Sequence, residues 1–308
     1  MNAKVKKEPG AGGNLHIQNI AYYKQYLLEN QNDFIEKIRL PCFFINLNGP
    51  ELSISSVIYG NKIIVDPYGF TLSLASSSIW LEDFARIFHA LKNAFEALRT
   101  YYNGPPPEIS SSQRQYPYPD SFQSNYGKIQ FKYHTTLNSH PFIFLVDVLG
   151  NQPNLPRRLI VKFTRQYPYA IHQTCASLHI APELYGCATL PGGWFMVIMA
   201  YMVDYSMLGE YAPNPLIKAE VKKAMGQLHG LGYAHGDLRD VNILVRYSDA
   251  DSVVNVVFVD WDWAGKDGEV NYPLSINPII PRHPEAKALK AIRIGHDEFM
   301  FQNLFSSC

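Results

Sequence analysis

Two polar segments in the last third of the chain hold residues whose types suit phosphoryl transfer. The first reads HGDLRDVN over residues 235–242, and the second begins with Asp260 after an apolar run. Oxygen ligands such as the side chains of Asn242 and Asp260 are those that Mg²⁺ prefers. A carboxylate kept off the metal, such as that of Asp237, can accept a proton from an attacking hydroxyl. Phosphoryl transfer asks for little more than this positioning and positive charge on the phosphates.

The residues around these segments predict the elements that must present them. A helix is predicted after Asn214-Pro215, a cap followed by the helical position that tolerates proline, and its apolar residues recur on one face up to Gly230. Two strands are predicted next, at 243–245 and 253–259, with a polar turn between them. The two polar segments therefore lie in loops, one before the first strand and one after the second.

Further strands are predicted upstream of that helix, because short runs rich in Ile, Phe, Val and Tyr alternate with polar loops. These strands are expected at 129–133, 142–148, 158–163, 184–188 and 194–202. A helical stretch is expected between the third and the fourth of them, at about 170–179.

The first hundred residues have the pattern of a separate small domain. Helical patterns at 20–28 and 33–40 precede strands that Gly, Asn and Pro residues separate, predicted at 43–47, 52–59, 62–65 and 70–74. A longer helix with one apolar stripe follows, from a cap at Ser78 to a stop at Asn103-Gly104. We expect this helix to pack on a small antiparallel sheet.

Composition then divides the chain into four segments. Residues 1–14 carry Gly, Lys and Pro and are expected to form a flexible tail. Residues 15–104 are the small N-terminal α/β domain, and residues 105–121 are a Pro-rich linker. Residues 122–308 form a second domain, which contains both polar segments.

Charge and apolar runs limit the partners and the location. The 308 residues include 27 Lys and Arg against 27 Asp and Glu, whereas a nucleic-acid binder normally has a basic excess. The longest apolar run, residues 194–203, is well short of the roughly twenty residues that a membrane span needs. Four scattered cysteines and an N-terminus without an apolar secretory region favour an intracellular protein, cytoplasmic or nuclear. We therefore expect small-molecule or protein partners, with no nucleic acid and no membrane.

The polar segments resemble the protein-kinase-like superfamily. His235-x-Asp237-x-x-x-x-Asn242 followed by Asp260 is similar to the H-R-D-x-x-x-x-N and D-F-G signatures of that superfamily, and His-Gly-Asp-Leu is also similar to aminoglycoside and choline-type phosphotransferases. With the sequence DWDWAG at 260–265 and Tyr272-Pro273, the block most resembles fungal-type protein-kinase-like proteins. The resemblance implies an α+β fold: a bilobal kinase-like domain with a truncated C-lobe and a hinge near 199–202, behind a small α/β domain.

The resemblance also implies a role for each matching residue, with ATP and Mg²⁺ as cofactors. Asp237 would be the catalytic base and Arg239 the cation beside the transferred phosphate. Asn242 and Asp260 would be the metal ligands. ATP would be bound by the Lys162 side chain and by the hinge backbone at Met199, Tyr201 and Met202. His235 and Asp297 would support the catalytic loop, Asp297 through hydrogen bonds to its backbone.

Three departures from the kinase pattern leave the function open. The loop at 134–140 has no glycine to cover phosphates, and Gly236 replaces the usual arginine. The helical stretch that should carry an acid to pair with Lys162 has none, so His172 and Gln173 are the remaining candidates. The leading hypothesis is a Ser/Thr-type protein kinase. The alternatives are a catalytically silent pseudokinase that acts as a binding module and a small-molecule kinase.

Overall fold

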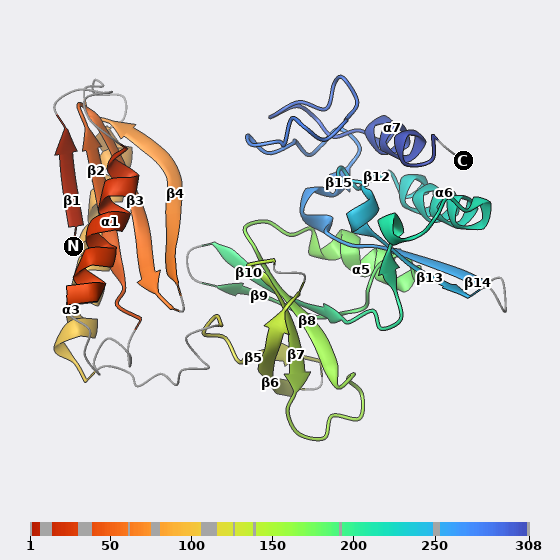
Figure 1. The fold of residues 1–308 in the computed structure, drawn as a ribbon, viewed down its shortest axis with the longest axis horizontal. Coiled ribbons are helices and arrows are strands. Elements are labelled where there is room, and N and C mark those ends of the chain that lie inside the picture. Colours follow the sequence, from red (N-terminus) through yellow and green to blue (C-terminus); the bar gives the residue numbers. More distant parts are fainter. Residues whose placement is uncertain are drawn as a thin grey trace. The chain divides into compact units, whose positions relative to one another are not determined.

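The structure of the chain, a computed structural model, separates into two compact units, Met1–Tyr118 and Pro119–Cys308 (Figure 1). The division falls inside the segment predicted as a linker, most of which, 106–115, lies outside the described residues. The residues that the structure describes are 2–6, 14–29, 39–60, 62–74, 81–105, 116–125, 127–137, 140–190, 193–248 and 253–306.

The described part of the first unit is built on a sheet of four strands in the order β1-β2-β3-β4. As predicted, β2 (Cys42–Asn48), β3 (Glu51–Tyr59) and β4 (Ile63–Ser73) pair antiparallel. The tail prediction for residues 1–14 is wrong in part, because β1 (Asn2–Lys6) pairs parallel with β2. The intervening α1 (Leu15–Glu29) provides the crossover that two parallel strands require.

A second prediction fails at Pro67, where a turn was expected and β4 continues as one strand. Pro67 pairs with Ser55, and the register shifts between Ser53 and Ser55. A proline is tolerated here because β4 is an edge strand of the described sheet, so on one side none of the described strands needs its N–H as a donor. The irregular register takes up the distortion, as β-bulges do.

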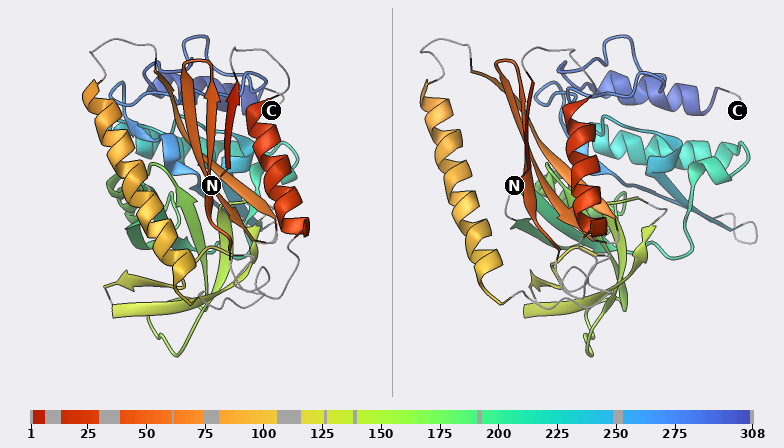
Figure 2. Two further views of the ribbon diagram at one scale, coloured as in Figure 1. Left: turned by 90° about the vertical axis from the view of Figure 1, so that its left-hand side faces the viewer. Right: turned by 60° about the vertical axis from the view of Figure 1, so that its left-hand side comes forward.

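Two helices cover opposite faces of this sheet, α1 and α3 (Leu81–Asn103) (Figure 2). Successive side chains of a strand point to opposite faces, and two neighbours in β2 meet different helices. Phe44 packs edge-on against Tyr23 of α1 at 5.9 Å between ring centroids, and Phe43 does so against Phe95 of α3 at 5.5 Å. Of the helix expected at 33–40, only residues 39 and 40 are among the described residues. The cap expected at Ser78 lies outside them.

The second unit opens with an antiparallel sheet in the order β5-β6-β7-β8-β10-β9. All but the short β5 were predicted. The helical stretch predicted between the third and fourth strands is α5 (Tyr169–Ser177). The strands are β5 (Ser121–Ser124), β6 (Gly127–Thr136), β7 (Ile143–Val148), β8 (Arg158–Thr164), β9 (Leu184–Leu190) and β10 (Trp194–Ala200).

The rest of the second unit combines helices with short strands. The predicted helix is α6 (Pro215–Gly230), and the Asn214 side chain accepts a hydrogen bond from the Leu216 amide at 2.8 Å, as a cap should. The last helix is α7 (Ile294–Leu304). The strands are β11 (Ser206–Met207), β13 (Ile243–Ser248) and β14 (Val253–Phe258), which form one sheet, and β12 (Tyr233–Ala234) with β15 (Gly265–Lys266), which form a pair.

One core lies beneath both polar loops. The buried face of α6, with Val221 and Leu228, belongs to the same cluster as Leu238 of the first loop and Trp261 of the second. Packing against this core therefore fixes both loops, so the side chains that they carry have defined positions. Among the described helices, none combines the length and hydropathy of a membrane span.

Phe44 gives a direct test of the first unit, because it is fully buried between β2 and α1. We expect Phe44→Ala to lower the free energy of unfolding by about 3–5 kcal/mol, since it removes a buried ring and leaves a cavity. Urea unfolding of the full chain measures this loss. The matched control is Ile17→Ala on the exposed side of α1, where Ile17 is 64% exposed and a change within about 0.5 kcal/mol is expected. Equal losses in the two variants would contradict the packing described.

Candidate active site

The first loop, between β12 and β13, gathers the predicted base, cation and one metal ligand around a single carboxylate. Asp237 Oδ2 accepts hydrogen bonds from Arg239 Nε at 3.0 Å and Nη2 at 2.7 Å. The Asn242 amide nitrogen donates to the same oxygen at 3.0 Å and to the Asp237 carbonyl at 2.8 Å. Asp237 and Asn242 are both buried. The cluster is therefore a fixed arrangement of polar groups inside the fold.

Asp297 of α7 holds this loop by its backbone, as the resemblance implied. Its carboxylate, only 1% exposed, accepts from the amide of His235 at 2.6 Å and from that of Gly236 at 2.9 Å. The His229 ring lies 3.2 Å from the same carboxylate. Gly236 has φ of +82°, and a Cβ there would lie 3.1 Å from the Ile292 side chain. Glycine suits this position because the backbone is left-handed and crowded.

His235 has the supporting role that was expected of it. Its Nε2 lies 3.0 Å from the carbonyl of Val259, which directly follows β14, and its ring centroid lies 5.1 Å from that of Trp261. The Val259 amide in turn donates to the Asn242 carbonyl at 2.9 Å. These contacts bring the first loop next to the second, which begins with Asp260.

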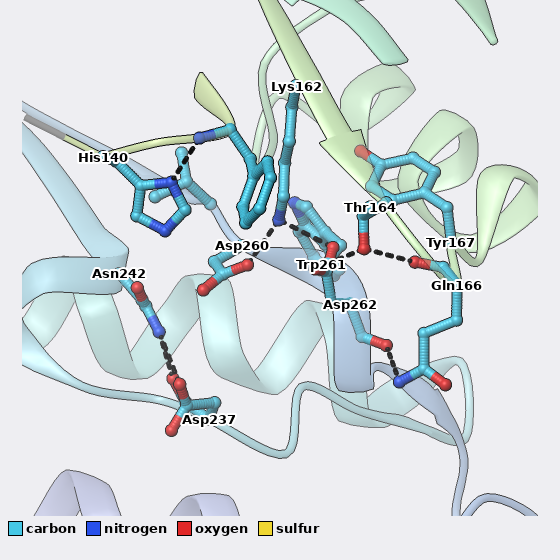
Figure 3. Close-up of polar contacts among 12 residues, drawn as sticks. His140, Lys162, Thr164, Gln166, Tyr167, Asp237, Asn242, Asp260, Trp261 and Asp262 are labelled. Carbon is cyan, nitrogen blue, oxygen red and sulfur yellow. Dashed lines mark hydrogen bonds and ion pairs between the residues drawn. The ribbon is translucent and has the colours of Figure 1, made fainter. Parts of the chain in front are cut away.

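The second loop meets Lys162 of β8 (Figure 3). The Lys162 ammonium lies 2.5 Å from Asp260 Oδ1 and 2.6 Å from Asp262 Oδ1. Asp260 has φ of +65°, a left-handed conformation that is uncommon outside glycine and turns the chain sharply out of β14. Trp261 anchors the turn, since its indole N–H donates to the Phe258 carbonyl at 3.0 Å.

Asp262 was not among the predicted site residues. Its Oδ2 accepts a hydrogen bond from the Thr164 hydroxyl at 2.8 Å, and its carbonyl accepts from Gln166 Nε2 at 2.9 Å. Figure 3 shows Lys162 between the two aspartates, with Thr164 and Gln166 beyond Asp262. The sequence places only the two partners of Asp262 together. Thr164 follows Lys162 by two positions in a strand, so both side chains face the same side.

Burial and ion pairing act against each other in this group. Burial alone would lower the pKa of Lys162, but the two carboxylates raise it above its ordinary value, so the amine stays charged. Burial works to raise the pKa of Asp260, and Lys162 holds it below its usual range. The pKa of Asp262 is raised, because burial and the charge of Asp260 outweigh Lys162 and Thr164.

Arg282 is a second residue that sequence reasoning missed. Its guanidinium, with a side chain 6% exposed, donates from Nη2 to Asp237 Oδ1 at 2.5 Å and lies 4.9 Å from the centre of the Trp263 ring. Both oxygens of Asp237 are thus engaged. No motif marks Arg282, because the contact joins segments that lie far apart in the chain.

The two loops and the segment that carries Arg282 enclose a cavity of about 330 Å³. Acidic and basic groups share its wall, and both arginines there are paired with Asp237. The residues that line it are Asp237, Arg239, Asp260, Asp262, Trp263, Ser275, Asn277, Ile280 and Arg282.

The predicted hinge is placed at the end of β10, outside that set of lining residues. Met199 is buried against Leu145, Ile160 and Val197, and Tyr201 packs on the same cluster. Met202 is partly buried. Nucleotide binding by the backbone of these residues stays a prediction.

Neither candidate on α5 replaces the missing acid. The His172 ring contacts the Tyr167 hydroxyl and, at 2.7 Å, the Pro182 carbonyl, and burial lowers its pKa to about 4. A ring that is neutral at pH 7 cannot neutralise an ammonium. Gln173 is exposed. In the part of the chain that the structure describes, the carboxylates that pair with Lys162 are Asp260 and Asp262.

Asp297 tests whether the first loop depends on α7. We expect Asp297→Asn to lower the free energy of unfolding by about 2–4 kcal/mol, because an amide group would oppose one of the two backbone N–H groups and the charge would be lost. Urea unfolding measures this loss. The neighbouring Glu298→Gln is the control, since Glu298 is exposed on the same helix. A loss no larger than that of the control would contradict the support described.

Comparisons with known proteins find similar solved structures but no related sequence. No protein-family model matches the sequence, and no curated protein matches it either. The kinase PK-1 of the Cydia pomonella granulovirus is similar in structure, with 14% sequence identity and a TM-score of 0.42, over 58% of this chain and 69% of that one. A likeness at this identity transfers no function, so the role of the site rests on its own geometry.

Proposed function

We propose that this chain is an ATP- and Mg²⁺-dependent phosphotransferase with a protein-kinase-like domain of the fungal type. The observation that carries the proposal is the meeting of two loops at one cavity, with Asp237 and Arg239 on the first and Asp260 on the second. Asn242, behind the lining residues, is hydrogen-bonded to Asp237. Lys162 lies against Asp260 from the neighbouring sheet. Such a set supplies a base, cations and oxygen ligands within one small space.

The donor set fits a magnesium ion. The Asn242 amide nitrogen is committed to Asp237, which leaves the amide oxygen as the atom offered to a metal. Asp260 gives one oxygen to Lys162, and its side chain, 39% exposed, reaches the cavity. Carboxylate and amide oxygens are the ligands that Mg²⁺ takes alongside the phosphates of a nucleotide. When bound, the ion would neutralise charge on those phosphates.

The other residues follow from their chemistry. Lys162 is the cation for the phosphates of ATP, and the backbone of the hinge would bind the adenine. Arg239 offsets charge on the transferred phosphoryl group. Asp237 accepts the proton of the acceptor hydroxyl, and its contacts with Arg239 and Asn242 fix the orientation of the carboxylate.

For the acceptor, we propose a Ser or Thr hydroxyl of a protein, since Arg239 at this point of the loop is typical of protein kinases. A small-molecule acceptor is the alternative that His-Gly-Asp-Leu favours. A catalytically silent binding module is a further candidate, and one contact favours it. Arg282 donates a hydrogen bond to Asp237 Oδ1, the oxygen that does not contact Arg239 or Asn242. Both oxygens of the proposed base are then engaged with other side chains.

Asp237 separates catalysis from nucleotide binding. We expect Asp237→Asn to lower the rate of phosphate transfer from ATP by about a hundredfold to ten-thousandfold, because an amide cannot accept the proton. Autophosphorylation and transfer to a Ser/Thr peptide mixture, measured with labelled ATP, test this. Asp240→Asn in the same loop is the matched control, since its side-chain oxygen can still accept from the Val241 amide. Full activity in Asp237→Asn would rule out the role of base.

Binding of the metal and nucleotide is tested by thermal unfolding. We expect ATP with Mg²⁺ to raise the Tm more than either alone, since a ligand that binds only the folded state stabilises it. Asp260→Asn should remove the magnesium-dependent part of the shift, and Lys162→Met most of the rest. A wild-type Tm that no combination changes would contradict a nucleotide site. A shift without any phosphate transfer would favour the silent module.

A further inference from the structure

We propose that Asp262 is the positioning residue for Lys162 and does the work that protein kinases assign to a glutamate on the helix after the third strand. The inference rests on the proposed function, in which Lys162 binds the phosphates of ATP. That helix is α5 here, and it carries no acid. A buried ammonium needs a fixed anion, because an unpaired buried charge is costly. Asp262 supplies this anion from the loop after β14.

The first step of the argument is the geometry of the Asp262 carboxylate. One of its oxygens lies 2.6 Å from the Lys162 ammonium, and the other lies 2.8 Å from the Thr164 hydroxyl. Lys162 and Thr164 project from the same face of β8, so a single carboxylate spans both. The aspartate is therefore held by the strand whose lysine it pairs with.

The second step is the rigidity of the loop that carries Asp262. The Gln166 side chain donates to the Asp262 carbonyl at 2.9 Å, and the Ala264 amide closes a turn with the Trp261 carbonyl at 2.9 Å. Trp261, the residue before Asp262, is 1% exposed and stacks on the His172 ring of α5 with 5.5 Å between the ring centroids. Packing on both sides thus fixes the backbone at Asp262.

The third step separates the two aspartates that share Lys162. Both oxygens of Asp262 are used by the protein, one by Lys162 and one by Thr164, and its side chain is 23% exposed. Asp260 has the more exposed side chain, at 39%, and contacts Lys162 through one oxygen. Asp260 is thus the residue with capacity for a metal. When Lys162 exchanges Asp260 for a phosphate, Asp262 keeps the ammonium in place.

One consequence concerns regulation. Where the partner of the lysine is on a helix, moving that helix makes or breaks the ion pair. Here the partner is in the second loop, and the buried polar group of α5, His172, is tied to Tyr167 and Pro182. The ion pair of the lysine is therefore formed in this structure without an acid on α5.

A kinetic test distinguishes positioning from metal binding. We expect Asp262→Asn to lower kcat/KM for ATP by about tenfold to a hundredfold, the effect of losing a hydrogen bond to a charged group. The Mg²⁺ concentration for half-maximal activity should stay within twofold of the wild type, whereas Asp260→Asn should raise it by tenfold or more. Thr164→Val should act as Asp262→Asn does, with a smaller loss. Gln173→Ala on the exposed side of α5 is the control and should leave all constants unchanged.

Two kinetic results would overturn the proposal. A shift of the magnesium requirement in Asp262→Asn as large as that in Asp260→Asn would make Asp262 a metal ligand. Unchanged kcat/KM in both Asp262→Asn and Thr164→Val would mean that Lys162 needs no such partner.

A second measurement is independent of activity and of the proposed function. Urea unfolding of the nucleotide-free full chain is compared for Lys162→Met, Asp262→Asn and the double variant. Partners in a buried pair are coupled, so the double variant should lose clearly less stability than the sum of the two single losses. Additive losses would overturn the pairing. Coupling in a protein that binds no nucleotide would leave the pairing intact and refute the kinase function alone.

Discussion

The buried ammonium of Lys162 is the constraint on which the site depends. Its side chain is 7% exposed, and a charge removed from water to this extent costs several kcal/mol unless it is paired and hydrogen-bonded. Two carboxylates from the loop after β14 meet this need. The sheet that carries β8 and the helical part of the second unit are thereby joined at one point by charge. These ion pairs fix the positions of Asp260 and Asp262, which line the cavity.

The same principle recurs at the two other buried carboxylates of the site, with a different outcome at each. The Asp297 carboxylate accepts hydrogen bonds from backbone amides of the first loop and does not line the cavity, so its role is structural. The Asp237 carboxylate forms ion pairs with the side chains of Arg239 and Arg282, and it does line the cavity. The partners of a buried acid thus distinguish support from chemistry more clearly than burial does.

Local patterns in the sequence predicted the elements that build the site and much less of the contacts between them. Strands such as β8 and the capped α6 follow from periodicity and from Asn214-Pro215, which act within a few residues. Asp262 and Arg282 were missed because their partners, Lys162 and Asp237, are distant in the chain, and no local pattern encodes a tertiary ion pair. The strand β1 was missed for a related reason, since pairing with β2 overrides a weak local preference. The roles of Asp237, Asn242 and Asp260 came from the resemblance, and the structure shows where these residues lie without testing what they do.

The way in which the two loops are anchored explains how a site can be held without an acid on α5. The first loop is tied to α7 through Asp297, and the second is tied to the core through Trp261 and to β8 through Thr164 and Gln166. His235 and the backbone of Asn242 connect one loop to the other through Val259. These anchors lie in elements that pack on a shared core, in β8 or in the loop directly after it. Because α5 contributes through the packing of His172 on Trp261, its part is steric rather than ionic. A loss of the helix acid is tolerable in such a frame, because the charge that Lys162 requires comes from a loop that packing already holds in position.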